Sequence, residues 1–190
     1  SVGTFHQLGL RIIRAQRKEL GLKSGFSIFD AEDTRTLIRD LLIQQHGAEG
    51  DQANTIAQRI STWKNDRMLP EQALATAKSP ADILCAQAYL RYKRALKAYN
   101  ALDFDDLILL PTILFEHHPA MLEKWQNQIH YLLVDEYQDT NSSQYLLVKQ
   151  LIGMRGGLTV VGDDDQSIYA WRGARPENLV QLQEDFPGLK

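Results

Sequence analysis

The sequence predicts an α/β fold in which a parallel sheet is combined with an all-helical insertion. Two short apolar runs, 131–134 and 158–161, each end at acidic residues, and a helical pattern over 142–154 separates them. Strand, helix, strand at this spacing is a βαβ unit, which requires parallel strands. The long stretch before them has helical periodicity instead. These observations predict a sheet domain that carries a helical subdomain.

The helices follow from apolar spacing and from residues that begin or end helices. They are expected over 4–20, 30–46, 53–65, a short stretch between Pro70 and Pro80, 81–100, 104–115 with an interruption or bend at Pro111, and 176–186. We expect Asp30 to cap the second helix, with Asp33 three residues later. The helical stretch predicts an insertion subdomain over 15–100, and 1–14 with 101–190 then form the α/β domain. Because two strands do not make a stable sheet, we expect the chain to be part of a longer protein.

Composition narrows the class of protein. The 190 residues are 44% hydrophobic and 24% charged, which is typical of a globular domain, and the net charge of −3 gives no overall positive field. Any nucleic-acid contact must therefore be local. Cys85 is the single cysteine, so no internal disulfide can form, as expected of a cytoplasmic protein. No apolar run reaches the roughly 18 residues of a membrane span, so no membrane partner is expected.

The first apolar run continues into adjacent carboxylates, in LLVDEYQDTN (132–141). A buried parallel strand that ends in this way delivers Asp135 and Glu136 to the ligand-binding edge of the sheet. In phosphoryl transfer the first carboxylate holds Mg²⁺ and the second polarises the attacking water. The alternative is that Asp135 merely caps the following segment. Adjacent acids at a strand end favour a nucleotide-hydrolysing site.

The second apolar run also ends in carboxylates, in LTVVGDDDQSIYAWRGA (158–174). The amide of Gln166 can hydrogen-bond a terminal phosphate, although a solvated loop amide is the simpler interpretation of this residue alone. Tyr169 and Trp171 lie two residues apart, which places both rings on one face of an extended segment. Beside Arg172 they can form a platform on which nucleobases stack. A role in the core is the alternative for both rings.

Together LLVDEYQDTN and VVGDDDQSIYAWRGA resemble motifs II and III of superfamily 1A DNA helicases, the UvrD/Rep/PcrA group. TFHQLGLRIIR (4–14) is similar to the family's TxH region and LDFDDLILLP (102–111) to its DFDDL motif. The resemblance extends over essentially the whole chain and is strongest to the Rep branch. It implies a RecA-like P-loop NTPase domain, here partial (1A), with its helical insertion (1B). It also implies an ATP-driven motor that moves 3′ to 5′ on single-stranded DNA and unwinds duplex.

The resemblance assigns roles to individual residues. It implies that Asp135 holds Mg²⁺ and that Glu136 is the catalytic base of ATP hydrolysis, with both in the nucleotide site. It makes Gln166 the contact to the γ-phosphate. The DNA-binding residues that it implies are Thr4, His6, Tyr169, Trp171 and Arg172, of which Arg172 also couples ATP to DNA. The implied partners are single-stranded DNA, junctions of single- and double-stranded DNA, and replication or repair proteins bound through segments not present here.

The chain departs from the family pattern because no GxxxxGK[ST] phosphate loop occurs in it. We therefore expect ATP and Mg²⁺ to be cofactors of an intact parent, and the isolated chain to be inactive. Two basic runs, 11–23 and 91–97, could contact DNA phosphates or be solvated helix faces. The second run contains Tyr92 among its basic residues.

Two further hypotheses remain open at this point. The chain could be a non-catalytic module that binds single-stranded nucleic acid through the stacking loop and the basic runs. It could also come from a repair helicase of the UvrD/PcrA type or from the motor of a helicase-nuclease. A Glu136→Gln change in a parent protein separates an enzyme from a binding module.

Overall fold

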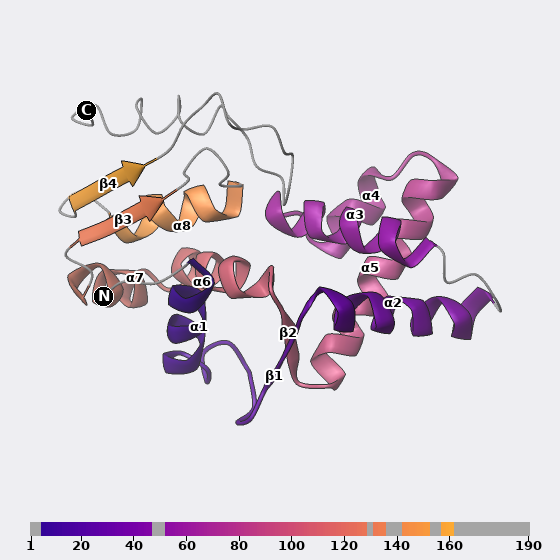
Figure 1. Cartoon of the computed structure of the whole chain (residues 1–190), viewed down its shortest axis with the longest axis horizontal. Helices are drawn as coiled ribbons and strands as arrows, with labels where there is room; N and C mark the ends of the chain where they lie inside the picture. Colours follow the sequence, from indigo (N-terminus) through magenta and orange to yellow (C-terminus); the bar gives the residue numbers. More distant parts are fainter. Residues whose placement is uncertain (1–4, 47–51, 129–130, 136–141, 153–156, 162–190) are drawn as a thin grey trace. The chain divides into compact units, whose positions relative to one another are not determined.

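The computed structural model describes residues 5–46, 52–128, 131–135, 142–152 and 157–161 (Figure 1). The chain forms two compact units, each with its own internal contacts. The helical unit is Ile13–Leu107, and the α/β unit is Ser1–Ile12 together with Ile108–Lys190. In chain order the elements are α1 (Phe5–Ala15), β1 (Ser27–Phe29), α2 (Ala31–His46), α3 (Ala53–Asn65), α4 (Pro70–Thr76), α5 (Pro80–Ala98), β2 (Ala101–Asp103), α6 (Asp106–His117), α7 (Pro119–Gln128), β3 (Tyr131–Asp135), α8 (Ser142–Ile152) and β4 (Gly157–Val161).

The core of the helical unit lies among α2, α3 and α5, which pack against one another, with α4 against α5. The apolar stripe predicted for α2 is confirmed, since Leu37, Ile38 and Leu42 are buried and Leu41 packs against them. Trp63 of α3 stacks on Tyr89 of α5, with ring centroids 5.7 Å apart. Burial of these rings and aliphatic side chains drives the folding of the helices, because apolar area is removed from water.

The insertion is not all-helical, contrary to the sequence prediction. β1 lies inside 15–100 and pairs in parallel with β2, in the register Ser27↔Ala101, Ile28↔Leu102 and Phe29↔Asp103. Each strand has only three residues, too few to show an alternating pattern. The pair forms because Asn100 brings the end of α5 back to the segment before β1. Its side chain donates to the carbonyl of Lys23 (3.1 Å) and accepts from the Lys23 N–H (3.0 Å).

Asn100 takes this place because of its backbone conformation. Its φ is 52°, in the left-handed region, where asparagine is tolerated better than most residues. The residue stands just past the C-cap of α5, where a helix commonly turns into a left-handed residue. Its carbonyl then accepts from the N–H of Ser27 (3.1 Å), which begins β1. The end of one helix thus starts the strand pair.

The predicted cap of α2 is confirmed. Asp33 N–H donates to the Asp30 carboxylate (2.8 Å) and Asp30 N–H donates to the Asp33 carboxylate (3.1 Å), a reciprocal capping box. The backbone N–H of Asp33 is the largest influence that lowers the pKa of Asp30. The helix therefore begins where the sequence placed it.

The α/β unit contains the predicted βαβ arrangement. β3 and β4 pair in parallel, from Tyr131↔Gly157 to Asp135↔Val161, and α8 lies between them in sequence and packs on β3 (Figure 1). α7, which packs against α8, was not among the helices predicted from the sequence. Proline is favoured at the first position of a helix, and here Pro119 begins α7. Trp125 of α7 is buried.

Candidate functional site

The candidate nucleotide site begins at the carboxyl ends of β3 and β4. Asp135 is the last residue of β3 and lies opposite Val161, the last residue of β4. The two strands therefore end at the same edge of the sheet, which is where open α/β sheets bind ligands. Glu136 follows the first strand in sequence and Gly162-Asp163 follow the second. A strand-end carboxylate is a hard oxygen donor and fits Mg²⁺ by its chemistry.

Most of the predicted site residues lie outside the described part of the chain: Thr4, Glu136, Gln166, Tyr169, Trp171 and Arg172. Their roles stay predictions. His6 lies in the first turn of α1 and is half-buried. Among the described residues, no group of three His, Cys, Asp or Glu could hold a metal ion. Likewise, no helix in the described ranges is long and apolar enough to cross a membrane.

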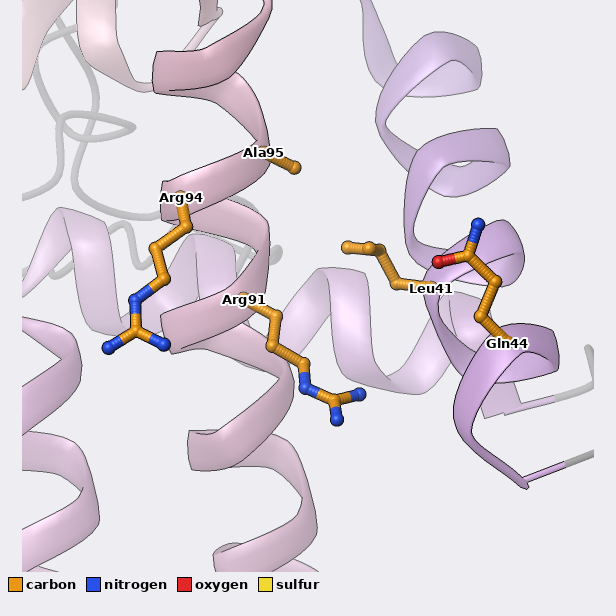
Figure 2. Close-up of a pocket in the computed structure, with 5 residues that line it drawn as sticks. All are labelled: Leu41, Gln44, Arg91, Arg94 and Ala95. Atoms are coloured by element: carbon orange, nitrogen blue, oxygen red, sulfur yellow. The ribbon is translucent and has the colours of Figure 1, made fainter.

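The basic run at 91–97 forms an outward face of α5. Arg94 and Lys97 are exposed and Arg91 is half-buried. Figure 2 shows Arg91 and Arg94 beside an open groove of about 420 Å³ between α5 and α2, with Leu41, Gln44 and Ala95 as its other lining residues. Tyr92 does not belong to this face, because its side chain is fully buried. The second basic run is thus a cationic surface without an interleaved aromatic ring.

In the other basic run, 11–23, some of the cationic side chains make contacts within the protein. The Arg11 guanidinium lies 5.9 Å from the centre of the Trp125 ring, close enough for a cation–π contact. Arg17 donates to the carbonyl of Leu22 (3.0 Å) and holds the turn that follows α1. Arg14, Lys18 and Lys23 are exposed. Fewer cations of this run are therefore available to a ligand than its sequence indicates.

A buried charge cluster, which the sequence did not predict, lies within the DFDDL segment. The Nζ of Lys64 donates to Asp103 Oδ2 (2.7 Å) and to Asp106 Oδ1 (2.9 Å). The two aspartates also form a capping box at the start of α6, since Asp106 N–H donates to Asp103 (2.9 Å) and Asp103 N–H donates to Asp106 (3.2 Å). All four carboxylate oxygens are thus hydrogen-bonded. Lys64 is only 4% exposed, so these charges interact with little solvent screening.

The electrostatics of this cluster follow from burial and proximity. Burial disfavours the charged form of Lys64, but the charges of Asp103 and Asp106 outweigh it and hold the lysine pKa well above its usual value. Burial, reinforced by the charge of Asp103, raises the pKa of Asp106 to about 7 against the opposing effect of Lys64. Burial also acts to raise the pKa of Asp103, yet Lys64 and the hydrogen bonds to the carboxylate lower it below its usual value. Asp103 is therefore the ionised partner of Lys64, and Asp106 is the carboxyl that can take up a proton.

Part of this cluster had a signal in the sequence. Acidic residues three apart directly before an apolar run, Asp103 and Asp106, have the spacing of a capping box. Nothing in the sequence pairs them with Lys64, which is 39 residues from Asp103. Lysine is almost never fully buried unless it is paired, so its residue type alone gives no indication of a buried position.

Comparison with known proteins shows which sequences this chain is similar to. The family model described as UvrD/REP helicase N-terminal domain matches residues 1–187. The chain is 54% identical over its full length to proteins named ATP-dependent DNA helicase Rep from Salmonella typhimurium and from Escherichia coli, and it covers 28% of each. It is 40% identical to ATP-dependent DNA helicase PcrA from Staphylococcus epidermidis, of which it covers 26%. The chain therefore spans little more than a quarter of these relatives, and it belongs to the UvrD/REP helicase N-terminal domain family.

Proposed function

We propose that this chain is part of an ATP-dependent 3′–5′ DNA helicase that couples ATP hydrolysis to movement on single-stranded DNA and to duplex unwinding in replication or repair. The observation that carries the proposal is the pair of parallel strands β3 and β4, which end together at Asp135 and Val161. Each continues into a motif rich in carboxylates. The names of the similar proteins, which are ATP-dependent DNA helicases, support it independently.

The proposal divides the chain into a partial RecA-like ATPase domain, 1–14 with 101–190, and an insertion subdomain, 15–100. Two compact units with nearby boundaries, at Ile12 and Leu107, support this division. A cytoplasmic location belongs to the same proposal, since the substrate is DNA and the chain has a single cysteine.

In the proposed nucleotide site Asp135 holds Mg²⁺, and Glu136 accepts a proton from the attacking water. Bound Mg²⁺ supplies positive charge that neutralises the phosphate oxygens of ATP. The amide of Gln166 donates to the γ-phosphate, and Arg172 couples ATP to DNA. The phosphate loop that this chemistry also requires is not in the sequence, so the isolated chain should not turn over ATP.

In the proposed DNA site Tyr169 and Trp171 stack on bases of the single strand, and Thr4 and His6 belong to a segment that binds this strand. Stacking of this kind contributes roughly 1–3 kcal/mol per base. The basic face of α5, with Arg91, Arg94 and Lys97, contacts phosphates near the junction of single- and double-stranded DNA. The exposure of Arg94 and Lys97 supports this assignment.

The first test is Glu136→Gln in the intact parent protein. This change removes the base but keeps the size and polarity of the side chain. We expect ATP turnover to fall by roughly 100-fold or more, while affinity for single-stranded DNA stays the same. Glu123→Gln, at an exposed position on α7, is the matched control and should leave turnover unchanged.

Two outcomes would contradict the proposal. Normal turnover by the Glu136→Gln protein would show that another group is the base. A wild-type parent that binds single-stranded DNA but does not hydrolyse ATP would favour the non-catalytic binding module.

A further inference from the structure

Five elements of the helical unit meet at one buried polar network. Tyr92 of α5 donates its hydroxyl proton to Asp103 Oδ2 of β2 (2.8 Å), the same oxygen that accepts from Lys64 of α3. The hydroxyl of Thr34 on α2 lies 3.0 Å from the hydroxyl of Tyr92. Because the tyrosine proton goes to Asp103, Thr34 is the donor in that second bond. Asp106 of α6, bound to Lys64, completes the network.

We propose that this network is a mechanical joint that transmits the position of α5, with nucleic acid on its outer face, to the start of α6, and that Tyr92 is its positioning residue. The inference rests on the proposed function, because it assigns a way in which DNA on the insertion regulates the ATPase. It concerns residues that touch neither ATP nor DNA. Its physical basis is a chain of directional contacts.

The first link is α5 itself. Arg91 and Arg94 are among the residues that line the groove, while the side chain of Tyr92, between them in sequence, is fully buried. A helix moves as a stiff unit, so a displacement of the basic face also displaces the Tyr92 hydroxyl. The hydroxyl is bound to Asp103, and Asp103 caps α6. A shift of α5 therefore also displaces the first turn of α6.

The second link is α6, which begins in the helical unit and continues in the α/β unit. Its residues Asp106 and Leu107 belong to the first, and those from Ile108 onward belong to the second. Within the α/β unit, the carbonyl of Thr112 accepts from Gln150 of α8 (3.1 Å). α8 begins at Ser142, shortly after the segment that contains Glu136. Within the helical unit, contacts thus lead from α5 to the first turn of α6, and within the α/β unit a hydrogen bond joins α6 to α8, the helix that follows the proposed catalytic carboxylates in sequence.

The chemistry of the network suits a joint better than it suits stability alone. Well-packed apolar residues usually stabilise a core as much as a buried ion cluster does. Hydrogen bonds to charged groups differ from apolar contacts because they depend strongly on distance and angle. A network of five hydrogen-bonded side chains, three of them charge-bearing residues, fixes one relative position of its elements, whereas an apolar interface tolerates small slides. Position is the property that a joint must preserve.

The test is Tyr92→Phe in the intact parent protein, with Tyr89→Phe as the matched control. Both tyrosines lie on α5, both are fully buried, and both lose one hydroxyl. The Tyr89 hydroxyl donates to the carbonyl of Met68 (2.9 Å), outside the network. The measurements are ATP turnover without DNA and with saturating single-stranded oligonucleotide, together with oligonucleotide affinity and thermal melting.

We expect Tyr92→Phe to lower the stimulation of ATP turnover by DNA about threefold to tenfold, with DNA-free turnover and DNA affinity within about twofold of wild type. Tyr89→Phe should leave the stimulation unchanged.

A Tyr92→Phe protein with wild-type stimulation would overturn the inference. An equal loss of stimulation in both variants would also overturn it, because the effect would then be a general response to core damage. A wild-type parent without DNA-stimulated turnover would overturn the proposed function itself. If Tyr92→Phe does not fold, Thr34→Val removes the other end of the hydroxyl pair and carries the same expectations.

Discussion

At the scale of single residues, the burial of Lys64 depends on its hydrogen-bond partners. A lysine this buried persists because Asp103 and Asp106 bind it at 2.7 and 2.9 Å. Lys64→Met keeps the length of the side chain but leaves two buried carboxyls without a counter-charge. We expect the free energy of unfolding to fall by about 3–5 kcal/mol, measured by urea denaturation of this chain. Lys93→Met, at an exposed position on α5, is the control, and an equally small effect of both changes would show that the cluster contributes little.

A second prediction at this scale concerns pH and Asp106. Its pKa is raised from the usual 3.8 to about 7 in the folded protein, so between these values the folded state holds a proton that the unfolded state has released. The contribution of Asp106 to the free energy of unfolding is therefore fully present below about pH 4, and it is lost as the pH rises to about 7. This group changes the free energy of unfolding by at most about 1.4 kcal/mol per pH unit. Asp103, whose pKa is lowered, acts in the opposite direction and only at acid pH.

Asp106→Asn isolates this effect, because it removes the titrating proton. The unfolding free energy of wild type minus that of the variant should decrease as the pH is raised from about 4 to about 7. Urea denaturation of both proteins across this range provides the measurement. A difference that stays constant or grows with pH would mean that Asp106 is ionised throughout.

At the scale of elements, helix starts are set by short local motifs. Ser79 precedes α5, and its hydroxyl accepts from the N–H of Asp82 (3.1 Å), while Pro80 occupies the first position of the helix. Ser79→Ala removes the cap and should lower the unfolding free energy by about 1 kcal/mol. Ser79→Asp keeps an acceptor and should remain near wild type. Equal denaturation curves for the alanine and aspartate variants would contradict the capping role.

α6 forms a helix although it contains a proline, which disfavours helices. Pro111 lies inside this helix, which runs from Asp106 to His117, so the predicted interruption is wrong, whereas the alternative of a bend stays a prediction. Proline removes one backbone donor from the helix interior. The hydroxyl of Thr112, which is fully buried, donates to the carbonyl of Leu109 (2.7 Å) and supplies a local bond in the same turn. The helix is also fixed at its start by the cluster around Lys64.

At the scale of the whole molecule, charge is distributed locally. The net charge of −3 coexists with a basic face on α5. If that face binds duplex phosphates in the intact parent, Arg91→Gln with Arg94→Gln should reduce the salt dependence of DNA binding. The slope of log affinity against log salt should fall by about 0.9 for each phosphate that is no longer neutralised. Lys124→Gln, on the exposed side of α7, should leave the slope unchanged, and an unchanged slope in the double variant would exclude this face.

The parallel strands β3 and β4 could be predicted from the sequence, and so could the main helices, because each rests on local periodicity and on cap residues such as Asp30. The β1–β2 pair could not, because three-residue strands acquire their partners only through Asn100. α7 was missed because proline both ends and begins helices. The site residues beyond β3 and β4 stay predictions from motif resemblance.

The family, the βαβ unit and the position of Asp135 at the end of a strand follow from the amino-acid sequence, since they depend on residues close together in the chain. Which residues of the basic runs face outward depends instead on the packing of distant segments. In the structure Tyr92 is buried, Arg11 lies over the ring of Trp125, and Lys64 binds Asp103 of the DFDDL segment. The physical reason is that burial and ion pairing depend on contacts between distant segments, which periodicity does not encode.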